Sequence, residues 1–341
     1  MKTLKWNSAR LKQILQNFKS KKILIIGDVG IDRYTIGSVD RISPEAPVPI
    51  VFVEEEKFKL GLAANCADNV HALGAVAWLT GIIGKDRAAL DFKDLLKLAR
   101  IKDTHLISDS TRRTVLKERI VSGNQQLLRI DYENFHPISG LTEKKAIEKI
   151  KSLMPRCDAV ILQDYAKGML TQALIDAVFE TAHEADKVVA VDPNPKTPLS
   201  MYLGASVLTP NTKEAEKLSG VTITDESSLH TAGQKILKAT GAKHVVITRG
   251  REGMAVFTAN SSDVHLIPTY AREVYDVSGA GDTVITVLTL ALASGATIEE
   301  SAILGNLAAG VEVAKRGTAT VSPEEIRVAM EFFEAVGMPS T

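Results

Sequence analysis

The sequence predicts an α/β fold in which helices cover a mostly parallel sheet and a small β-subdomain stands beside it. Three observations favour this class. Short apolar runs such as residues 23–26 are typical of strands buried on both faces. From residue 141 onward, such runs alternate regularly with amphipathic helical segments. Polar side chains recur where the runs end, which is where open α/β sheets bind ligands.

Composition excludes several classes of partner. The chain has 341 residues with 41 basic and 41 acidic side chains, so no basic surplus favours nucleic acid or an anionic membrane. The N-terminus lacks the apolar segment of a signal peptide, and no apolar stretch approaches the roughly 18 residues of a membrane span. Cys66 and Cys157 are far apart without a CxxC pattern, which favours reduced thiols. We therefore expect a cytoplasmic protein without nucleic-acid or membrane partners. The scattered histidines favour no metal site.

The first elements in the chain lead to a group of acidic residues. Residues 7–20 predict an amphipathic helix capped by Asn7 or Ser8, and a buried strand follows at 23–27. Asp28 and Asp32 come directly after this strand. Carboxylates there could accept hydrogen bonds from the hydroxyls of a polyol, although Asp28 could instead cap a turn.

Two separated segments predict the small β-subdomain. Residues 41–49 contain three prolines and precede a strand-like run at 50–53, while 112–121 and 125–131 form a hairpin pattern around Ser122-Gly123-Asn124. We expect the segments from about 33–60 and 111–132 to combine into a lid or a dimer clasp, because each alone would be marginal.

A small-residue helix lies between these segments. Gly61 opens it and Gly74 ends it. Asn65 in its first turn could reach a substrate hydroxyl, or could be a cap or solvent-facing residue. A strand at 76–83 and a helix at 86–100 follow.

The second half alternates strands with helices. Helices are predicted at 141–153, 171–185, 226–239 and 298–314, and strands at 159–162, 188–191, 205–208 and 244–247. Ser322 and Glu325 form a capping box at the start of a last helix. Polar side chains at or just after the strand ends describe one edge of the sheet laid out as a site: Asp164, Lys167, Asp192, Asn211, Thr248 and Arg249.

Residues 276–282, Asp-Val-Ser-Gly-Ala-Gly-Asp, predict an anion seat. Glycines before an apolar helix let backbone N–H groups turn toward an anion, and the helix N-terminus adds partial positive charge. A carboxylate beside a bound phosphate is repelled by it, so Asp282 is suited to take a proton from an attacking hydroxyl. The alternative is an ordinary glycine turn with an Asp cap.

The whole chain resembles the ribokinase-like sugar kinases, also called the PfkB family. Residues 276–282 fit the family's second signature at every fixed position, and 61–65 resemble the first. The resemblance implies a single kinase domain over 1–341, folded as a three-layer sandwich with a β-lid. Segments 41–49, 124–131, 164–168 and 274–277 resemble the branch that phosphorylates the anomeric hydroxyl of D-glycero-β-D-manno-heptose 7-phosphate for ADP-heptose and lipopolysaccharide core synthesis.

That branch is often fused to a nucleotidyltransferase. Because the chain ends at 341, we expect only the kinase portion.

The resemblance also implies roles for individual residues. Asp282 would be the base, and the N–H groups of Gly279, Ala280 and Gly281 would hold the charge of the transferred group. ATP is expected with Mg²⁺, oriented through water by Asn211 and Glu214, and K⁺ is a further candidate beside Asp276 and Ser278. The nucleotide would be lined by Thr248, Arg249, Gly250, Gly253 and Asn306. The sugar phosphate would contact Asp28, Asp32, Arg33, Asn65, Arg129, Asp164, Lys167 and Asp192. A homodimer through the β-subdomain is expected.

Two departures from the family pattern concern the substrate. Gly61-Leu62 stands where Gly-Gly is frequent, and Asp192-Pro-Asn194 stands where Asp-Pro-Lys is frequent. If the family's lysine at this position holds the sugar phosphate, then either Lys196 or Lys167 takes that role here, or the phosphate binds at a different site.

Three other functions are alternatives to a heptose-phosphate kinase. A kinase for another sugar and a non-catalytic sugar or nucleotide sensor stay open. A nicotinamide dehydrogenase is disfavoured because no strand is followed by GxGxxG, and no GxxxxGK[ST] loop is present.

Overall fold

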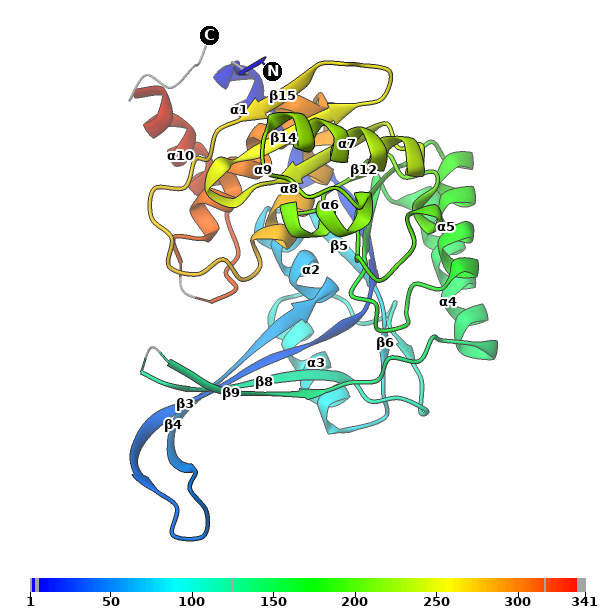
Figure 1. The fold of residues 1–341 in the computed structure, drawn as a ribbon. Helices are drawn as coiled ribbons and strands as arrows, with labels where there is room; N and C mark the ends of the chain where they lie inside the picture. The colour runs from blue at the N-terminus through cyan, green and yellow to red at the C-terminus, as the bar shows by residue number, and fades with distance from the viewer. Residues whose placement is uncertain (1, 4–5, 124, 316, 336–341) are drawn as a thin grey trace.

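The computed structural model describes residues 2–3, 6–123, 125–315 and 317–335. Within them the main sheet is mostly parallel, and only the pairings on either side of β14 are antiparallel (Figure 1). Its spatial order is β1 (Lys2–Thr3), β15 (Val264–Ile267), β14 (Met254–Thr258), β13 (His244–Thr248), β12 (Val207–Leu208), β11 (Val188–Asp192), β10 (Ala159–Gln163), β2 (Lys22–Gly27) and β5 (Val76–Thr80). The predicted α/β class is confirmed.

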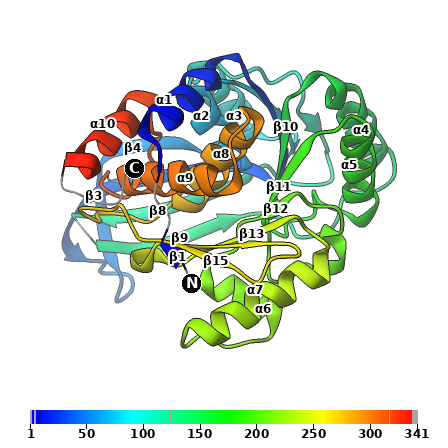
Figure 2. The same cartoon turned by 90° about the horizontal axis from the view of Figure 1, so that it is seen from above.

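Helices cover both faces of this sheet, so the body has three layers (Figure 2). One face carries α1 (Ser8–Asn17), α2 (Ala63–Ala72), α3 (Arg87–Leu98), α8 (Ala280–Ala293), α9 (Ile298–Glu312) and α10 (Pro323–Ala335). The other carries α4 (Gly140–Leu153), α5 (Gln172–Glu184), α6 (Thr212–Ser219) and α7 (Glu226–Thr240).

Alternation along each strand supplies one apolar core per face. Ile23 and Ile25 of β2 pack with the helices around α8, while Leu24 and Ile26 pack with α4, α5 and α7. Because side chains alternate between the two faces, the position of a polar residue at the end of a strand decides which face it points to. Only the residues that point to the α8 face can contact α8.

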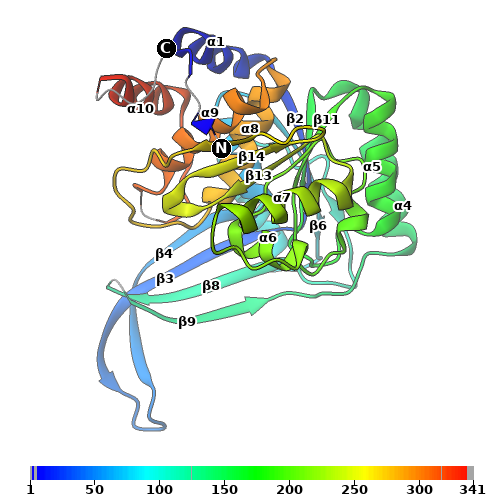
Figure 3. The same ribbon diagram turned by 45° about the horizontal axis from the view of Figure 1, so that its top comes forward.

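A second, mixed sheet forms the lid. Its order is β4 (Pro49–Leu62), β3 (Val29–Ile42), β8 (Val115–Ser122) and β9 (Gln125–Tyr132). The strands are longer than the sequence indicated, since β3 begins at Val29 and β4 continues to Leu62. The β3–β4 hairpin reaches far beyond the body (Figures 1 and 3). Asn124 of the predicted β8–β9 turn lies outside the described residues.

Most predicted elements are present within a few residues of the expected bounds. Asn7 caps α1 by accepting a hydrogen bond from the Arg10 N–H, and Ser322 and Glu325 form the expected capping box. The strand expected at 76–83 is instead divided at Gly81 into β5 and β6 (Ile82–Ile83), because β6 pairs with β7 (Ile107–Ser108) in a separate small sheet. Strands β14 and β15 had no counterpart among the expected elements.

Two simpler features concern the cysteines and the membrane. Cys66 and Cys157 are both buried, free thiols. Among the described helices, none is both long enough and apolar enough to cross a bilayer.

Candidate active site

The N-terminus of α8 forms the centre of the site. Its cap, Gly279, has a φ of 97°, in the left-handed region that favours glycine. A Cβ on Gly279 would lie 3.1 Å from the Asn65 amide nitrogen and 3.2 Å from Glu312 Oε1, whereas a Cβ on Gly281 would meet no atom within 4 Å. Gly279 therefore allows the tight turn, while Gly281 leaves open space in front of the first helical N–H groups.

Asp282 lies in the first turn of α8 with its carboxylate held from two sides. The Asn65 amide of α2 donates to Oδ2 at 2.7 Å, and the Tyr165 hydroxyl donates to Oδ1 at 2.9 Å. Burial raises the pKa of Asp282 to about 6, although these hydrogen bonds oppose the rise. A buried carboxylate with this pKa is mostly ionised at neutral pH and can still accept a proton, as a general base must.

The Gln163 side chain connects Asp282 with the neighbouring strand end. Its amide nitrogen lies 2.6 Å from Asp282 Oδ1 and 2.7 Å from Asp192 Oδ2. Burial, together with the negative charges of Glu214 and Asp282, raises the pKa of Asp192 well above its usual range. One buried amide thus separates two carboxylates that repel each other.

A polar cleft of about 180 Å³ opens in front of this group. Asp192, Glu214 and Asp282 contribute carboxylates to its lining, which also includes Thr209 and Gly281. Mg²⁺ in proteins commonly keeps several waters and needs only one or two carboxylates. Burial raises the pKa values of both Asp192 and Glu214, and the charges of Glu214 and Asp282 raise that of Asp192 further, so the chemistry of the lining fits such an ion.

Asn211 and Glu214, expected to orient Mg²⁺, line this cleft and also cap α6. The Glu214 N–H donates to Asn211 Oδ1 at 3.0 Å, and the Asn211 N–H donates to Glu214 Oε2 at 2.8 Å. This reciprocal capping box fixes both side chains at the cleft.

A second, largely apolar hollow of about 420 Å³ adjoins the cleft and shares Thr248 and Gly281 with it. Gly250, Gly253 and Asn306, which were predicted to line a nucleotide, also line this hollow. The Asn306 amide is already used, because it donates to the Pro268 carbonyl oxygen at 2.6 Å. Arg249 is absent from this lining and pairs with Glu252.

The absence of a side chain at Gly253 is required by the packing of the neighbouring backbone. A Cβ there would lie 1.9 Å from the Ile267 carbonyl oxygen, and its φ is 81°. The close approach that was expected toward a nucleotide is thus already required by the neighbouring strand β15.

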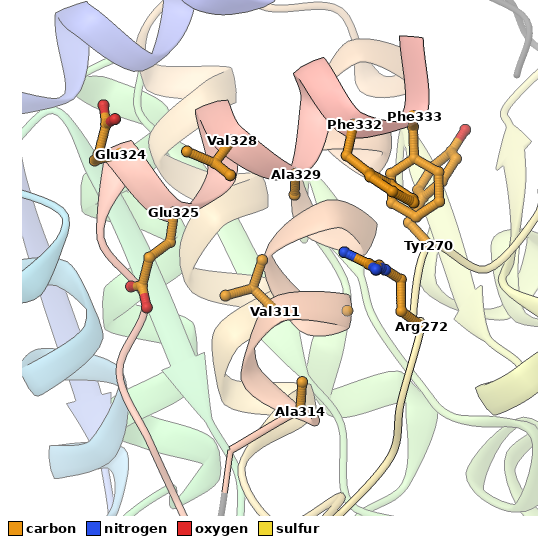
Figure 4. A pocket seen from close by; sticks show the side chains of 11 residues that line it. Tyr270, Arg272, Val311, Ala314, Glu324, Glu325, Val328, Ala329, Phe332 and Phe333 are labelled. Carbon is orange, nitrogen blue, oxygen red and sulfur yellow. The ribbon is translucent and has the colours of Figure 1, made fainter. Parts of the chain in front are cut away.

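A further hollow of about 340 Å³ lies on the other side of α9, beneath α10 (Figure 4). Gly310 lines both this hollow and the apolar one. Arg272 is the one arginine in the lining of the hollow beneath α10, and its guanidinium lies 3.9 Å from the centre of the Phe332 ring. Glu324 and Glu325 at the opposite end are paired with Arg327 and Lys315. The charged groups of this lining therefore already have partners within the chain.

Two acids expected to bind sugar hydroxyls hold protein groups instead. Asp28 accepts the N–H groups of Lys167 and Met169 at 3.0 and 3.1 Å, and burial raises its pKa to about 6. Asp164 accepts hydroxyl hydrogen bonds from Thr197 and Tyr202, both at 2.7 Å. Their clearest role in this structure is to shape the loops at the sheet edge.

Of the lid residues predicted to contact the sugar phosphate, Asp32 and Arg33 lie on opposite faces of the lid. Lys59, Asp32, Lys117 and Asp131 form one row across the four strands, and Asp32 pairs with Arg119. Lys59 of this row reaches the Thr318 carbonyl oxygen, so this face looks toward the body.

Neighbouring residues on a strand point to opposite faces, so Arg33 points away from the side of Asp32. Arg33 pairs with Glu56 and lies 3.6 Å from Glu118. Arg129 makes two 3.0 Å hydrogen bonds to Asp131.

The segment expected to hold a monovalent cation contains an unsatisfied buried acid. Asp276 accepts the N–H groups of Ser278 and Gly317 at 2.9 and 3.1 Å, while the Ser278 side chain is exposed. Glu312 is fully buried, and neither of its carboxylate oxygens has a hydrogen-bond partner among the described residues. Burial raises the pKa of Glu312 to about 8. An orphaned carboxyl beside Gly279 fits a cation site at this turn.

Sequence reasoning did not single out Gln163 and Tyr165. Strand parity is the signal that identifies Gln163. Ala159 and Ile161 of β10 belong to the core on the α8 side, so Gln163 points to that side and Asp164 does not. Tyr165 follows in the loop after β10, where no periodic pattern predicts its direction.

Comparison with known proteins supports the observed fold and the family. Residues 20–325 match the profile described as pfkB family carbohydrate kinase. The chain is 42% identical over 320 residues to the "Bifunctional protein HldE" of Trichlorobacter lovleyi, covering 94% of this chain and 65% of that protein. The protein of the same name from Caulobacter vibrioides is 42% identical over 317 residues, which cover 93% and 65% of the two chains. The chain therefore spans a little less than two thirds of these curated relatives.

Two solved structures show the same fold at low sequence identity. Arabidopsis thaliana ribokinase complexed with ribose and ATP has a TM-score of 0.74 at 18% identity, covering 92% of this chain and 99% of that one. Escherichia coli phosphofructokinase-2 in complex with potassium has a TM-score of 0.76 at 18% identity, with the same coverage of both chains.

Proposed function

Since the chain belongs to the pfkB family of carbohydrate kinases, we propose that it transfers the γ-phosphoryl group of ATP to the anomeric hydroxyl of D-glycero-β-D-manno-heptose 7-phosphate. The observation that carries this proposal is the position of Asp282. It lies at the N-terminus of α8, where the polar cleft meets residues at the ends of β10 and β11. The heptose is chosen because segments 41–49, 124–131, 164–168 and 274–277 resemble the heptose-phosphate branch of the family.

In this proposal Asp282 receives the proton of the attacking hydroxyl. An anomeric hydroxyl is more acidic than an ordinary alcohol, so a carboxylate with a pKa of about 6 is a sufficient base. General-base assistance is typically worth about 10²–10⁴-fold. Asn65, Tyr165 and Gln163 hold the carboxylate in place.

Backbone N–H groups would stabilise the charge on the transferred group. Ala280 and Gly281 lie in the first turn of α8, where N–H groups lack intrahelical acceptors. One such donor is typically worth about 3 kcal/mol to the transition state. The space in front of Gly281 leaves room for the phosphoryl group.

ATP would occupy the apolar hollow with its phosphates directed into the cleft through the shared Thr248 and Gly281. Mg²⁺ would neutralise phosphate charge, and Glu214 and Asp192 are the side chains placed to hold its waters. Asp276, Ser278 and the orphaned Glu312 are proposed to hold K⁺.

The lid is proposed to join two copies of the chain. The guanidinium groups of Arg41 and Arg33 lie 5.5 and 5.4 Å from the ring centres of Phe52 and Phe58, yet the β3–β4 arm still exposes large apolar side chains. These side chains are Ile42, Val48, Phe52, Val53 and Phe58. A second arm of the same kind would bury them, and the expected mass by light scattering is that of a dimer. A monomeric mass at micromolar concentration would contradict this part of the proposal.

A substrate panel tests the reaction. With ATP consumption coupled to a readout, heptose 7-phosphate should be turned over with a higher kcat/KM than fructose 6-phosphate or ribose. Faster turnover of either of those sugars would identify a kinase for another sugar. No turnover of any sugar, together with ATP binding, would favour a sensor.

The product would be heptose 1,7-bisphosphate, an intermediate for ADP-heptose and lipopolysaccharide core synthesis. The related proteins are named bifunctional, and the chain spans about 65% of their length. We propose that it performs the kinase step of that pair of activities.

A further inference from the structure

The loop after β10, residues 164–169, presents Tyr165 to the base next to a strained residue. The Tyr165 hydroxyl donates to Asp282 Oδ1 at 2.9 Å, and the following residue, Ala166, has a φ of 52°. A residue with a Cβ rarely adopts this left-handed region, because the Cβ comes too close to the following carbonyl oxygen. Such a conformation persists only where the surrounding structure fixes the backbone. The contacts that fix this loop therefore bear on Asp282.

A buried carboxylate holds the loop on one side of Ala166. Asp28 lies between β2 and β3, and it accepts the N–H groups of Lys167 and Met169 at 3.0 and 3.1 Å. Burying a charge costs free energy unless hydrogen bonds satisfy it, and these two backbone donors do so. Asp28 therefore fixes the backbone from one residue beyond Ala166.

A buried arginine holds the same part of the loop. Arg112 lies between β7 and β8, and its Nη2 donates to the Lys167 carbonyl oxygen at 2.5 Å. Its guanidinium interacts electrostatically with Asp28 and Asp109, while its buried Nη1 has no hydrogen-bond partner among the described residues. Replacing buried ions by apolar side chains is often neutral or stabilising. A buried guanidinium with one unpaired nitrogen is therefore explained better by its contact with the loop than by stability.

The two anchors act on a single residue. Asp28 accepts the Lys167 N–H, and Arg112 donates to the Lys167 carbonyl oxygen, so both backbone polar groups of Lys167 are held. Without these anchors Ala166 can relax out of the left-handed region. Because Tyr165 is the preceding residue, that relaxation would carry its hydroxyl away from Asp282.

We propose that Asp28 and Arg112 are positioning residues, which hold the loop through Lys167 so that the Tyr165 hydroxyl stays on Asp282. The inference rests on the proposed function, in which Asp282 is the base. It gives Asp28 a role other than the sugar contact predicted from the sequence. Among the described residues no hydrogen bond or ion pair joins Asp28 or Arg112 to Asp282, so each acts through the loop.

The pKa of Asp282 in the substrate-free protein tests this assignment. It is measured by carbon NMR of the carboxyl group, with Asp282→Asn identifying the resonance. The Tyr165 hydroxyl favours the ionised carboxylate, so Tyr165→Phe should raise the pKa of Asp282 from about 6 to about 7 or higher. Asp28→Asn and Arg112→Met should raise it as well, because both release the loop. The acidic limb of kcat/KM, which reports the free protein, should move in parallel.

The two anchor variants change the charge in opposite senses. Through electrostatics alone, loss of the Asp28 charge would lower the pKa of Asp282, and loss of the Arg112 charge would raise it. A rise in both variants therefore reports the position of the loop. Adding Tyr165→Phe to either variant should cause little further rise, because the hydroxyl contact is already lost. Arg112→Lys, which keeps the charge and a donor, should restore most of the wild-type value.

Arg113→Met is the matched control, because Arg113 is exposed and its side chain makes no hydrogen bond or ion pair with the described residues. An unchanged or lower pKa of Asp282 in Asp28→Asn would overturn the inference. A full additional rise on adding Tyr165→Phe, or an equal rise in Arg113→Met, would also overturn it. If circular dichroism shows that Arg112→Met is unfolded, Asp28→Asn decides, because asparagine keeps the shape of aspartate.

These measurements need no substrate, so they separate the inference from the function on which it rests. A wild-type protein that phosphorylates no sugar would refute the proposed function, and the pKa of Asp282 in the variants would still decide whether the anchors hold Tyr165. A wild-type protein that phosphorylates heptose 7-phosphate, with the same acidic limb in Asp28→Asn, would refute the inference alone.

Discussion

The side-chain amide of Asn65 lies 2.7 Å from Oδ2 of Asp282, and this hydrogen bond joins two residues that are 217 positions apart. Asn65 lies in the first turn of α2, directly after the lid strand β4. Asp282 lies in the first turn of α8. The lid and the N-terminus of α8 are therefore connected through the carboxylate that we propose as the base.

The first prediction concerns this hydrogen bond. A donor to the ionised carboxylate favours ionisation, so Asn65→Ala should raise the pKa of Asp282 above its present value of about 6. The acidic limb of the kcat/KM profile, which should rise with pH through about 6 in the wild type, would then move to higher pH. Asn69→Ala is the control, because Asn69 is buried on the same helix and has no recorded hydrogen bond to Asp282. An unchanged acidic limb in Asn65→Ala would contradict the role of Asp282.

The second prediction is that Asp282→Asn lowers the activity of the protein but raises its thermal stability at pH 8. Asp282→Asn should lower kcat by about 10²–10⁴-fold. The pKa of Asp282 is raised in the folded state, so its contribution to stability is complete at acidic pH and is lost as the pH rises through about 6. The variant should therefore melt at a higher temperature than the wild type at pH 8, with little difference at pH 4. The two-unit rise corresponds to about 3 kcal/mol at most. A lower melting temperature at pH 8 would show that the charge stabilises the fold.

The third prediction contrasts two neighbouring glycines. Gly281→Ala should keep or raise the melting temperature, because alanine favours the helix and its Cβ meets no protein atom within 4 Å. The same Cβ would occupy the space for the phosphoryl group, so kcat/KM for ATP should fall at least tenfold. Gly279→Ala should instead lower stability by roughly 1 kcal/mol or more, because Gly279 has a φ of 97°. Calorimetry and kinetics on both variants check this contrast. Full activity of Gly281→Ala would exclude phosphate binding at this turn.

The fourth prediction concerns Gln163. Gln163→Met keeps the length of the side chain but removes the amide between Asp192 and Asp282, which leaves two buried carboxylates without their shared donor. We expect kcat to fall about 10- to 100-fold, since a hydrogen bond to a charged group is worth roughly 1.5–3 kcal/mol. The Mg²⁺ concentration for half-maximal rate should also change. Gln172→Met on the exposed face of α5 is the control. Unchanged kinetics in Gln163→Met would mean that the bridge has no functional role.

The fifth prediction tests the cation site at Glu312. At a pH above 8, where Glu312 is mostly ionised, and in about 150 mM KCl, the physiological ionic strength, the wild type should melt at a higher temperature than in an equal concentration of tetramethylammonium chloride. Glu312→Gln should abolish this difference, because the orphaned carboxylate no longer attracts the ion. The difference should persist in Glu325→Gln, whose carboxylate lies on the surface beside Lys315. An equal response to K⁺ in Glu312→Gln would remove Glu312 from the site.

Sequence periodicity predicted the helices, the parallel strands and the lid, because these follow from local apolar patterns. It did not predict β14 and β15, the antiparallel strands that extend the sheet. It also underestimated β4, because the strand-like apolar run ends at residue 53, where charged residues 54–56 begin, although the backbone stays paired to Leu62. Charge patterns describe exposure and do not decide whether the backbone is paired.

The candidate site shows a similar division. The glycines and Asp282 were identifiable from one local motif, and the structure places them together at the start of α8. The roles of Asp28 and Asp164 depend on long-range partners, such as the Lys167 N–H and the Tyr202 hydroxyl, which no local pattern reveals. The family resemblance assigned both Asp32 and Arg33 to the sugar phosphate, although strand parity sends the two side chains to opposite faces.

The most direct test of the proposed function is the reaction of heptose 7-phosphate with ATP and Mg²⁺, followed by phosphorus NMR. The account predicts a new resonance from a phosphate on the anomeric carbon, with the 7-phosphate retained and ADP formed in equal amount. Asp282→Asn should show neither the new resonance nor ADP on the same timescale. A product phosphorylated at another hydroxyl, or no product while another sugar is phosphorylated, would contradict it.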